Sequence, residues 1–224
     1  PIYERAQPYP EGTLGYAISW PQCGSALPER PFDFGIIGVT GGRGLTRNPC
    51  FAEEWAWATR TSLRPTVYIN LNYVEGIVPA GLPIFACDPR NAKCAAYSYG
   101  RAVAIDALEY ASTAGAHPGM WWLDVQIAST WSTDVDLNFS AIRGAMDTLT
   151  ERGVRVGISS TALQWREVTG DLHPHGLPVW SAEAVDREMA GRMCASGRDF
   201  GAGPTEQIAY VANGFETVLA CGRR

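Results

Sequence analysis

Residues 138–160, NFSAIRGAMDTLTERGVRVGISS, contain a complete transition from a helix to a strand. Asn138 is an acceptable N-cap for the helix. Hydrophobic residues then recur at the spacing of one helix face: Ile142, Met146 and Leu149. Gly153 is the kind of residue that commonly ends a helix, and the β-rich run 154–160 follows at once. The stretch predicts a helix over 138–152 that leads directly into a strand.

The same alternation of short β-rich runs and longer amphipathic runs extends along the chain. We expect eight strands, at 15–20, 34–40, 66–72, 120–125, 154–160, 177–182, 206–211 and 215–220. We expect helices at 50–62, 97–114, 138–152 and 161–169, and a short one at 183–194. Alternating strands and helices are typical of a parallel sheet. Because the helical signal fades after residue 170, we predict an α/β fold, an irregular TIM-like (β/α) barrel with helix-poor last strands.

A doubly wound open sheet is the alternative topology. It would place a glycine-rich phosphate-binding turn after the first strand. The residues found there, Trp20-Pro21-Gln22-Cys23, cannot form such a turn. No repeat, linker or low-complexity tract interrupts the sequence, so we expect one barrel domain over 1–224, with 1–12 as an N-terminal extension.

The composition narrows the classes of partner. The chain has 224 residues and a formal net charge of −5, with no basic run beyond Arg223-Arg224, which argues against nucleic acid. No apolar run approaches the roughly 20 residues that span a bilayer. The sequence begins at Pro1, and we expect that a leader has been removed.

Six cysteines indicate an oxidising compartment. Their spacings do not resemble zinc-ligand patterns, and six cysteines allow about 15 pairings in principle. Their positions favour three local disulfides: Cys23–Cys50, Cys87–Cys94 and Cys194–Cys221. The alternative is six free buried thiols in a cytosolic enzyme. We expect a secreted protein, extracellular or in the cell wall.

Functional residues of an α/β barrel gather at the carboxyl ends of the strands. The residues at these ends are polar groups interleaved with aromatic rings: Ser19, Trp20, Gln22, Thr40, Gly41, Gly42, Asn70, Asn72, Tyr73, Asp124, Gln126, Trp131, Asp134, Ser159, Ser160, Thr161, Trp180, Ser181, Glu183 and Tyr210. Such a set suits a polyhydroxylated ligand, whose C–H faces stack on rings and whose hydroxyls bond to amides. The proposed substrate contacts are Gln22, Asn70, Asn72, Tyr73, Trp131 and Trp180. Trp121 and Trp122 are adjacent on a strand, so only one of them can face the barrel interior.

The strongest local signal is Trp121-Trp122-Leu123-Asp124-Val125-Gln126, at the end of the fourth strand. Residues two apart on a strand point to the same side, so Asp124 and Gln126 should both face the barrel mouth. Glycoside hydrolysis needs one carboxylic acid to protonate the leaving oxygen and a second carboxylate as base, nucleophile or stabiliser. Asp-x-Gln supplies only one of the two.

Four motifs together resemble a known family. They are the stretch from Gly15 to Cys23 (GYAISWPQC), the strand end IGVTGG at 37–42, Asn48-Pro49-Cys50, and the Trp-Trp-Leu-Asp-Val stretch. In order and spacing they are similar to the lysozyme-type family 25 glycoside hydrolases, specifically their secreted, uncharacterised actinobacterial branch. The resemblance runs from Gly15 to about Cys221. It implies a barrel whose later strands lack helices and a cell-envelope polysaccharide as substrate, with peptidoglycan as the family default and another envelope glycan as the alternative.

The resemblance also assigns catalytic positions. Asp124 matches the first acidic residue of the family's Asp-x-Glu on the fourth strand. Gln126 stands where the general-acid Glu is expected, and Ala17 stands where the family has an Asp on its first strand. In the parental form, position 126 would be the acid, Asp124 the stabiliser or helper base, and position 17 a carboxylate that orients water or substrate.

Two missing carboxylates leave three explanations open. The chain is an engineered inactive variant, a natural pseudoenzyme that only binds glycan, or an enzyme in which another acid has taken over. Candidates for that acid are Glu183, Asp134 and Asp136. Because a Gln amide cannot donate a proton at a useful pH, we expect this chain to turn over poorly or not at all.

Other chemistries fit less well. A Ser-His-Asp hydrolase needs Gly-x-Ser-x-Gly, and Gly157-Ile158-Ser159-Ser160 lacks the second glycine. His173-Pro174-His175 could bind a metal but has no nearby acidic ligands. We therefore expect no metal and no cofactor, a monomer, and a polysaccharide or oligosaccharide as ligand. The serious alternative to a disabled hydrolase is a non-catalytic glycan-binding module.

Overall fold

The computed structural model describes residues 8–76, 88, 90–172, 176–196 and 205–221. The strands are β1 Leu14–Ile18, β2 Phe34–Gly38, β3 Thr66–Asn70, β4 Trp121–Asp124, β5 Val156–Ser160, β6 Val179–Ser181, β7 Thr205–Ala212 and β8 Phe215–Ala220. The helices are the short 3-10 turn η2 Trp20–Gln22 and α1 Phe51–Ala58, α2 Ala92–Thr113, α3 Val135–Glu151, α4 Ala162–Thr169 and α5 Arg187–Ser196. Each predicted strand and helix is present. Of the described helices, none is both long and apolar enough to cross a membrane.

The eight strands form a closed barrel in the order β1 to β8. Neighbouring strands from β1 to β7 are parallel, whereas β8 is antiparallel to both β7 and β1 and closes the barrel between them. Asn213 and Gly214 alone join β7 to β8, with φ of 53° and 81°. Positive φ at both central residues is typical of a two-residue hairpin turn, and Asn-Gly is its strongest sequence signal. The predicted (β/α) barrel with helix-poor last strands is confirmed.

Two apolar layers lie on opposite sides of the barrel wall. Inside the barrel, Trp122 packs with side chains of β1, β2, β6, β7 and β8, including Ala17 and Trp180. Trp121 belongs to the outer layer, between the sheet and the helices. This division confirms that only one residue of the tryptophan pair faces the interior.

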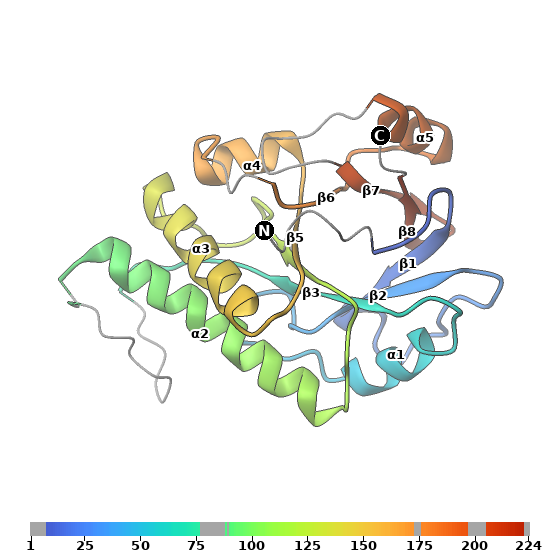
Figure 1. Ribbon diagram of the computed structural model, residues 1–224, viewed down its shortest axis with the longest axis horizontal. Helices are drawn as coiled ribbons and strands as arrows, with labels where there is room; N and C mark the ends of the chain where they lie inside the picture. Colours follow the sequence, from blue (N-terminus) through green and yellow to red (C-terminus); the bar gives the residue numbers. More distant parts are fainter. Residues whose placement is uncertain (1–7, 77–87, 89, 173–175, 197–204, 222–224) are drawn as a thin grey trace.

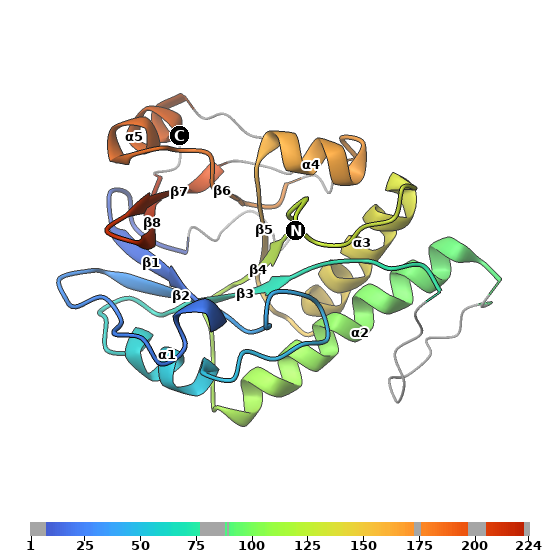
Figure 2. The ribbon, with the colours of Figure 1, turned by 180° about the vertical axis from the view of Figure 1, so that it is seen from behind.

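The helices cover the outside of the barrel unevenly. In two opposite views, α2 and α3 lie side by side along one flank, and α1 lies beside β2 (Figures 1 and 2). On the β7–β8 side the packing helix is α5.

The prediction that Asn138 caps α3 is wrong. The N-cap is Asp134, whose side chain accepts a hydrogen bond from the backbone N–H of Asp136. Asn138 is buried one turn later, and its amide Nδ2 donates to the backbone oxygens of Ser132 and Val168. Gly153, with φ of 72°, does follow the end of this helix as predicted. α2 begins at Ala92, earlier than expected, because Asn91 accepts from the N–H of Cys94 and caps it.

Two of the predicted disulfides are confirmed. Cys23–Cys50 joins the segment after η2 to the start of α1, and Cys194–Cys221 joins α5 to the residue after β8. The predicted Cys87–Cys94 pair involves Cys87, which lies outside the described residues.

The α2–α3 pair is in contact at the level of the backbone. A Cβ atom on Gly100 would lie 1.7 Å from the carbonyl oxygen of Ala141. A Cβ atom on Gly144 would lie 1.9 Å from the carbonyl oxygen of Tyr97. These distances leave no room for any side chain, so the two glycines fix how closely the helices approach.

We therefore predict that Gly100→Ala forces α2 and α3 apart and lowers the free energy of unfolding by about 3 kcal/mol. Gly191→Ala in α5 is the matched control, because a Cβ atom there meets nothing within 4 Å. It should raise stability by about 0.5–1 kcal/mol through the better helix propensity of alanine. Denaturant unfolding followed by circular dichroism measures both. Equal effects of the two substitutions would contradict the close helix contact.

Candidate active site

The carboxyl ends of β3, β4 and β5 carry three polar residues in register. Asn70 pairs with Asp124, and Asp124 pairs with Ser159. Partners on neighbouring strands point to the same face, so the three side chains form one row across the sheet. Tyr68 and Trp180, which contact each other edge to face, lie on the same inner face of the barrel. Trp180 pairs with Ser159 and so continues the row, and Tyr68 lies two residues before Asn70 on β3.

The Asp124 carboxyl is buried and accepts hydrogen bonds on both oxygens. The side chain is 4% exposed. Asn70 Nδ2 donates to Oδ2 at 2.6 Å, and Gln126 Nε2 donates to Oδ1 at 3.1 Å. Burial raises the pKa of Asp124 to about 6. The hydrogen bonds from Gln126, Asn70 and Ser159 lower it and so limit that rise.

Neighbouring groups hold the Asn70 side-chain amide and the Gln126 backbone in place. Thr40 Oγ1 donates to Asn70 Oδ1 at 2.8 Å and accepts from the Asn70 backbone N–H at 3.0 Å. Trp131 Nε1 donates to the backbone oxygen of Gln126 at 2.8 Å. The side chain of Asn70 can therefore present only its NH₂ group to Asp124, as observed.

A second carboxyl group faces the same interior and was missed by the sequence reasoning. Glu216 of β8 is paired with Ala17 of β1 and with Val211 of β7. Ala17 belongs to the interior cluster, so the Glu216 side chain points inward next to the position where a first-strand Asp was expected. Removal from water and, to a smaller extent, the charge of Asp124 together raise the pKa of Glu216 to about 7.

The Tyr68 hydroxyl lies close enough to both Asp124 and Glu216 for their charges to affect its pKa. Burial raises the pKa of this hydroxyl, a hydrogen bond with Ser19 lowers it, and the charges of Asp124 and Glu216 raise it again. Two carboxyl groups and a phenol thus share one poorly solvated region. A carboxyl with a pKa near 7 is protonated often enough at neutral pH to donate a proton, which is what acid catalysis requires.

The other predicted acids have local structural contacts. Glu183 is exposed, and its Oε1 accepts from the backbone N–H of Ala162 at 2.6 Å, at the start of α4. Asp134 caps α3, and Asp136 forms an exposed ion pair with Lys93 at 2.6 Å. These contacts do not include the hydrogen-bonded row around Asp124.

The predicted substrate contacts lie in different surroundings. Asn72 is buried, and its Oδ1 accepts from the Gly44 backbone N–H at 2.8 Å and from the Tyr99 hydroxyl at 3.2 Å. Tyr73 is 3% exposed and packs against Tyr99 in the outer core. Gln22 is half-buried, and its Oε1 accepts from the backbone N–H of Ser19 at 3.0 Å.

The aromatic residues differ in exposure. Trp180 lies within β6, not beyond it, and is 2% exposed in the barrel interior. Tyr210 packs on the outer layer with α5 and not at the mouth, because alternation along β7 turns Ala209 inward instead. Trp131 is half-buried. Trp20 is 47% exposed at the end of β1 and presents an accessible ring.

Among the residues that the structure describes, two buried polar side chains of β6 and β7 find no hydrogen-bond partner. They are the indole N–H of Trp180 and the whole amide of Gln207, which pair across β6 and β7. Buried polar groups of this kind are typically satisfied by an ordered water molecule.

Within the described ranges, no group of three or more His, Cys, Asp or Glu side chains could hold a metal ion. The His173-Pro174-His175 stretch lies outside those ranges.

The raised pKa of Glu216 predicts a pH-dependent stability. An acid that holds its proton more tightly in the folded state stabilises the fold at low pH, and that contribution is lost as the pH rises to about 7. Glu216→Gln should therefore raise the free energy of unfolding at pH 8 by about 2 kcal/mol and change it little at pH 4. Glu167→Gln, at an exposed position of α4, is the control for removing a charge. Denaturant unfolding at both pH values measures the difference, and a Glu216→Gln effect independent of pH would refute it.

Comparisons with known proteins support the resemblance. The model of the family "Lysozyme-like protein 1" matches residues 92–202. The "Probable GH family 25 lysozyme 4" of Dictyostelium discoideum is 32% identical over 76 residues, which are 34% of this chain and 35% of that relative. The chain thus matches about a third of that relative's length.

Solved structures share the fold along almost the whole chain. The muramidase from Acremonium alcalophilum has a TM-score of 0.60 at 16% identity, over 94% of each chain. A family GH25 lysozyme from Aspergillus fumigatus has a TM-score of 0.55 at 14% identity, also over 94% of each chain. The modular Cpl-1 endolysin, as a Glu-to-Gln mutant in complex with a tetrasaccharide-pentapeptide, has a TM-score of 0.52 at 14% identity, over 96% of this chain and 55% of that one. The resemblance to the lysozyme-type family 25 glycoside hydrolases is therefore confirmed, in fold over nearly the whole chain and in sequence over part of it.

Proposed function

We propose that this protein is a glycoside hydrolase-type barrel that binds a cell-wall polysaccharide at its mouth, and that Gln126 leaves it with little or no hydrolytic activity. The observation that carries the proposal is the Asp124 carboxylate, buried in a barrel of the lysozyme type and hydrogen-bonded to the amide at position 126. A Glu at this position could give a proton to a leaving oxygen, whereas the Gln amide only donates a hydrogen bond to Asp124.

We assign the catalytic roles from the family resemblance. Position 126 is that of the general acid, and Asp124 stabilises developing positive charge or assists as a base. Position 17 is that of a second carboxylate that orients water or substrate. Loss of a general acid typically lowers a rate by about 10²–10⁴-fold. The hydrogen bond between Gln126 and Asp124 supports a folded mouth that still binds its ligand.

Peptidoglycan is the proposed ligand. The Cpl-1 endolysin has the same fold, and its Glu-to-Gln mutant is in complex with a tetrasaccharide-pentapeptide, a peptidoglycan analogue. We further propose that the protein is secreted, as its disulfides suggest, and acts as a monomeric single domain. The alternative is a natural pseudoenzyme, which would bind glycan at the same mouth. It differs from an inactivated enzyme only in that the natural protein already lacks the two acids.

A second candidate is an active hydrolase in which Glu216 replaces the missing acid. The specific observation in its favour is the pKa of about 7 of Glu216, on the inward face beside Ala17. Glu183 is the substitute acid expected from the sequence. Mutation of each residue separately distinguishes Glu183 from Glu216.

The decisive measurement is the release of reducing ends from purified peptidoglycan. The double variant Ala17→Asp/Gln126→Glu should be at least about 10²-fold faster than the unsubstituted chain. Equal rates for these two proteins would refute the roles assigned to positions 17 and 126. Glu216→Gln and Glu183→Gln in the unsubstituted chain distinguish the substitutes, because only loss of the true acid removes residual activity. Thermal unfolding of each variant controls for folding.

The exposed ring of Trp20 should contribute to glycan binding. We predict that Trp20→Ala weakens binding of soluble peptidoglycan fragments by about tenfold, since stacking on an aromatic face is worth about 0.5–1.5 kcal/mol. Leu172→Ala, which removes an exposed apolar side chain 36% accessible beyond α4, is the matched control. Isothermal titration calorimetry measures both affinities. Unchanged affinity in Trp20→Ala would exclude this ring from the binding surface.

A further inference from the structure

A hollow lies at the opposite end of the barrel from Asp124. Its volume is about 420 Å³, and it opens at the amino ends of β4 and β5, beside the last turns of α2. Its lining includes the polar side chains of Arg64, His117 and Arg155 and the apolar side chains of Leu108, Trp121 and Val154. Because Asp124 ends β4 and Trp121 begins it, this hollow is separate from the proposed glycan site.

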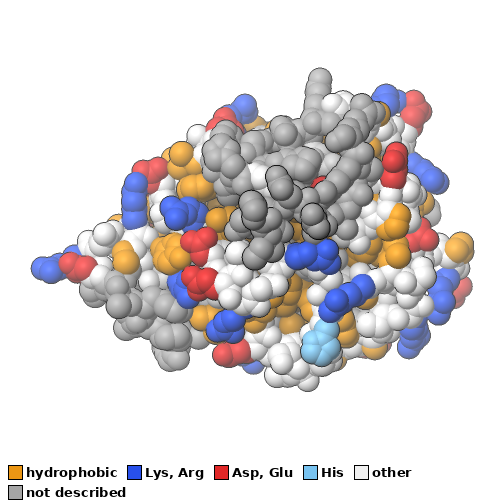
Figure 3. Space-filling model, in the orientation of Figure 1, with side chains coloured by type: hydrophobic (Ala, Val, Ile, Leu, Met, Phe, Trp, Pro, Cys, Tyr) orange, Lys and Arg blue, Asp and Glu red, His pale blue; other side chains and the backbone are white. Residues whose placement is uncertain are grey.

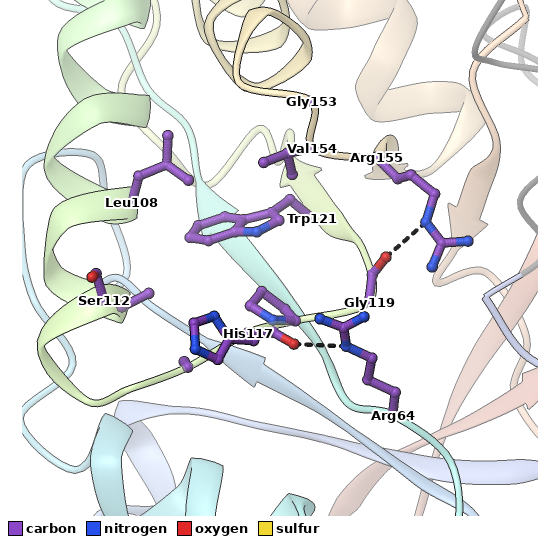
Figure 4. Close-up of a pocket in the computed structure, with 12 residues that line it drawn as sticks. Arg64, Leu108, Ser112, His117, Gly119, Trp121, Gly153, Val154 and Arg155 are labelled. Carbon is purple, nitrogen blue, oxygen red and sulfur yellow. Dashed lines mark hydrogen bonds between the residues drawn. The ribbon is translucent and has the colours of Figure 1, made fainter.

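Two arginines are oriented by the backbone at this hollow. Arg64 Nε donates to the carbonyl oxygen of His117 at 2.8 Å, and Arg155 Nε donates to that of Gly119 at 2.8 Å. Figure 4 shows both guanidinium groups approaching the short segment that contains these two carbonyls. Their terminal nitrogens form no hydrogen bond or ion pair with any residue that the structure describes. Each guanidinium is thus held at one nitrogen and can donate from the other two.

The side chains of both arginines pack around Gly119. A Cβ atom on that glycine would lie 3.5 Å from Nη2 of Arg155 and 3.6 Å from Cδ of Arg64.

The charges around the hollow all have one sign. The chain carries a net charge of −5, yet the lining has two arginines and a histidine and no Asp or Glu. In the space-filling view, basic side chains adjoin the coloured histidine next to exposed hydrophobic surface (Figure 3). A positive patch on an acidic protein indicates an anionic ligand.

We propose that this hollow binds the phosphate group of a phosphate-bearing cell-envelope polymer. A tetrahedral oxyanion offers acceptors in several directions and so matches donors that come from Arg64, Arg155 and His117. The apolar wall of Leu108, Trp121 and Val154 would take the carbon atoms next to the phosphate. The site would hold the protein on its polymer while the barrel mouth contacts glycan.

The test measures binding of three probes by calorimetry: inorganic phosphate, soluble poly(glycerol phosphate), and polyglutamate of equal charge. The full chain should bind both phosphate probes, and the polymer more tightly. Arg64→Gln/Arg155→Gln should weaken this binding by about tenfold or more, because both charge-assisted donors are lost. Arg90→Gln/Arg166→Gln, which removes the same charge at exposed positions, should leave it unchanged. Arg64→Lys/Arg155→Lys keeps the charge and should show an intermediate loss, even if the Gln variant unfolds.

Each outcome bears on the proposal. Equal affinity of the unsubstituted chain and the Arg64→Gln/Arg155→Gln variant for phosphate would overturn it, as would equally tight binding of polyglutamate. Binding of inorganic phosphate without the polymer would support a phosphate site and assign it to the free anion. The Asp124→Asn variant should bind all three probes like the unsubstituted chain, which keeps this test independent of the proposed glycan site.

Discussion

The buried carboxyl group of Asp124 constrains the elements around it. A carboxylate removed from water is costly unless donors surround it, and here amides from two elements supply them. Asn70 can present its NH₂ group because Thr40 of the preceding βα segment takes up its carbonyl oxygen. One desolvated acid thus ties together the ends of β2, β3 and β4. The same desolvation that makes the group costly for stability raises its pKa to about 6.

Most of the fold was predictable because it depends on local signals. Each strand is a short β-rich run and each helix an amphipathic one, so their order defines a (β/α) barrel. The antiparallel direction of β8 was not predicted, although Asn213-Gly214 indicated a tight hairpin. The start of α3 was misplaced because Asp134 and Asn138 are both good capping residues, and only packing shows that Asn138 is buried.

The site was predictable where strand alternation alone decides it. Asp124 and Gln126 lie two residues apart, so they share a face and form a hydrogen bond. Alternation does not tell which face of a strand is the interior. For this reason Tyr210 was expected at the mouth, although it packs on the outside of the barrel. Nor does alternation tell whether an aromatic side chain is accessible. For this reason Trp180 was expected to contact substrate, although it is buried. Glu216 was missed because its place beside Ala17 depends on pairing between the first and last strands, which no local pattern encodes.

The position of β8 between β1 and β7 has a consequence for folding. The contacts of β8 with β1 join strands that are almost a whole chain apart in sequence, so they carry a large loop-closure cost and form late. Until they form, the barrel has two unpaired edges and Glu216 is in water. The electrostatic environment of the mouth therefore depends on the pairing of β8 with β1. Before the barrel closes, the Glu216 carboxyl lacks the burial that raises its pKa.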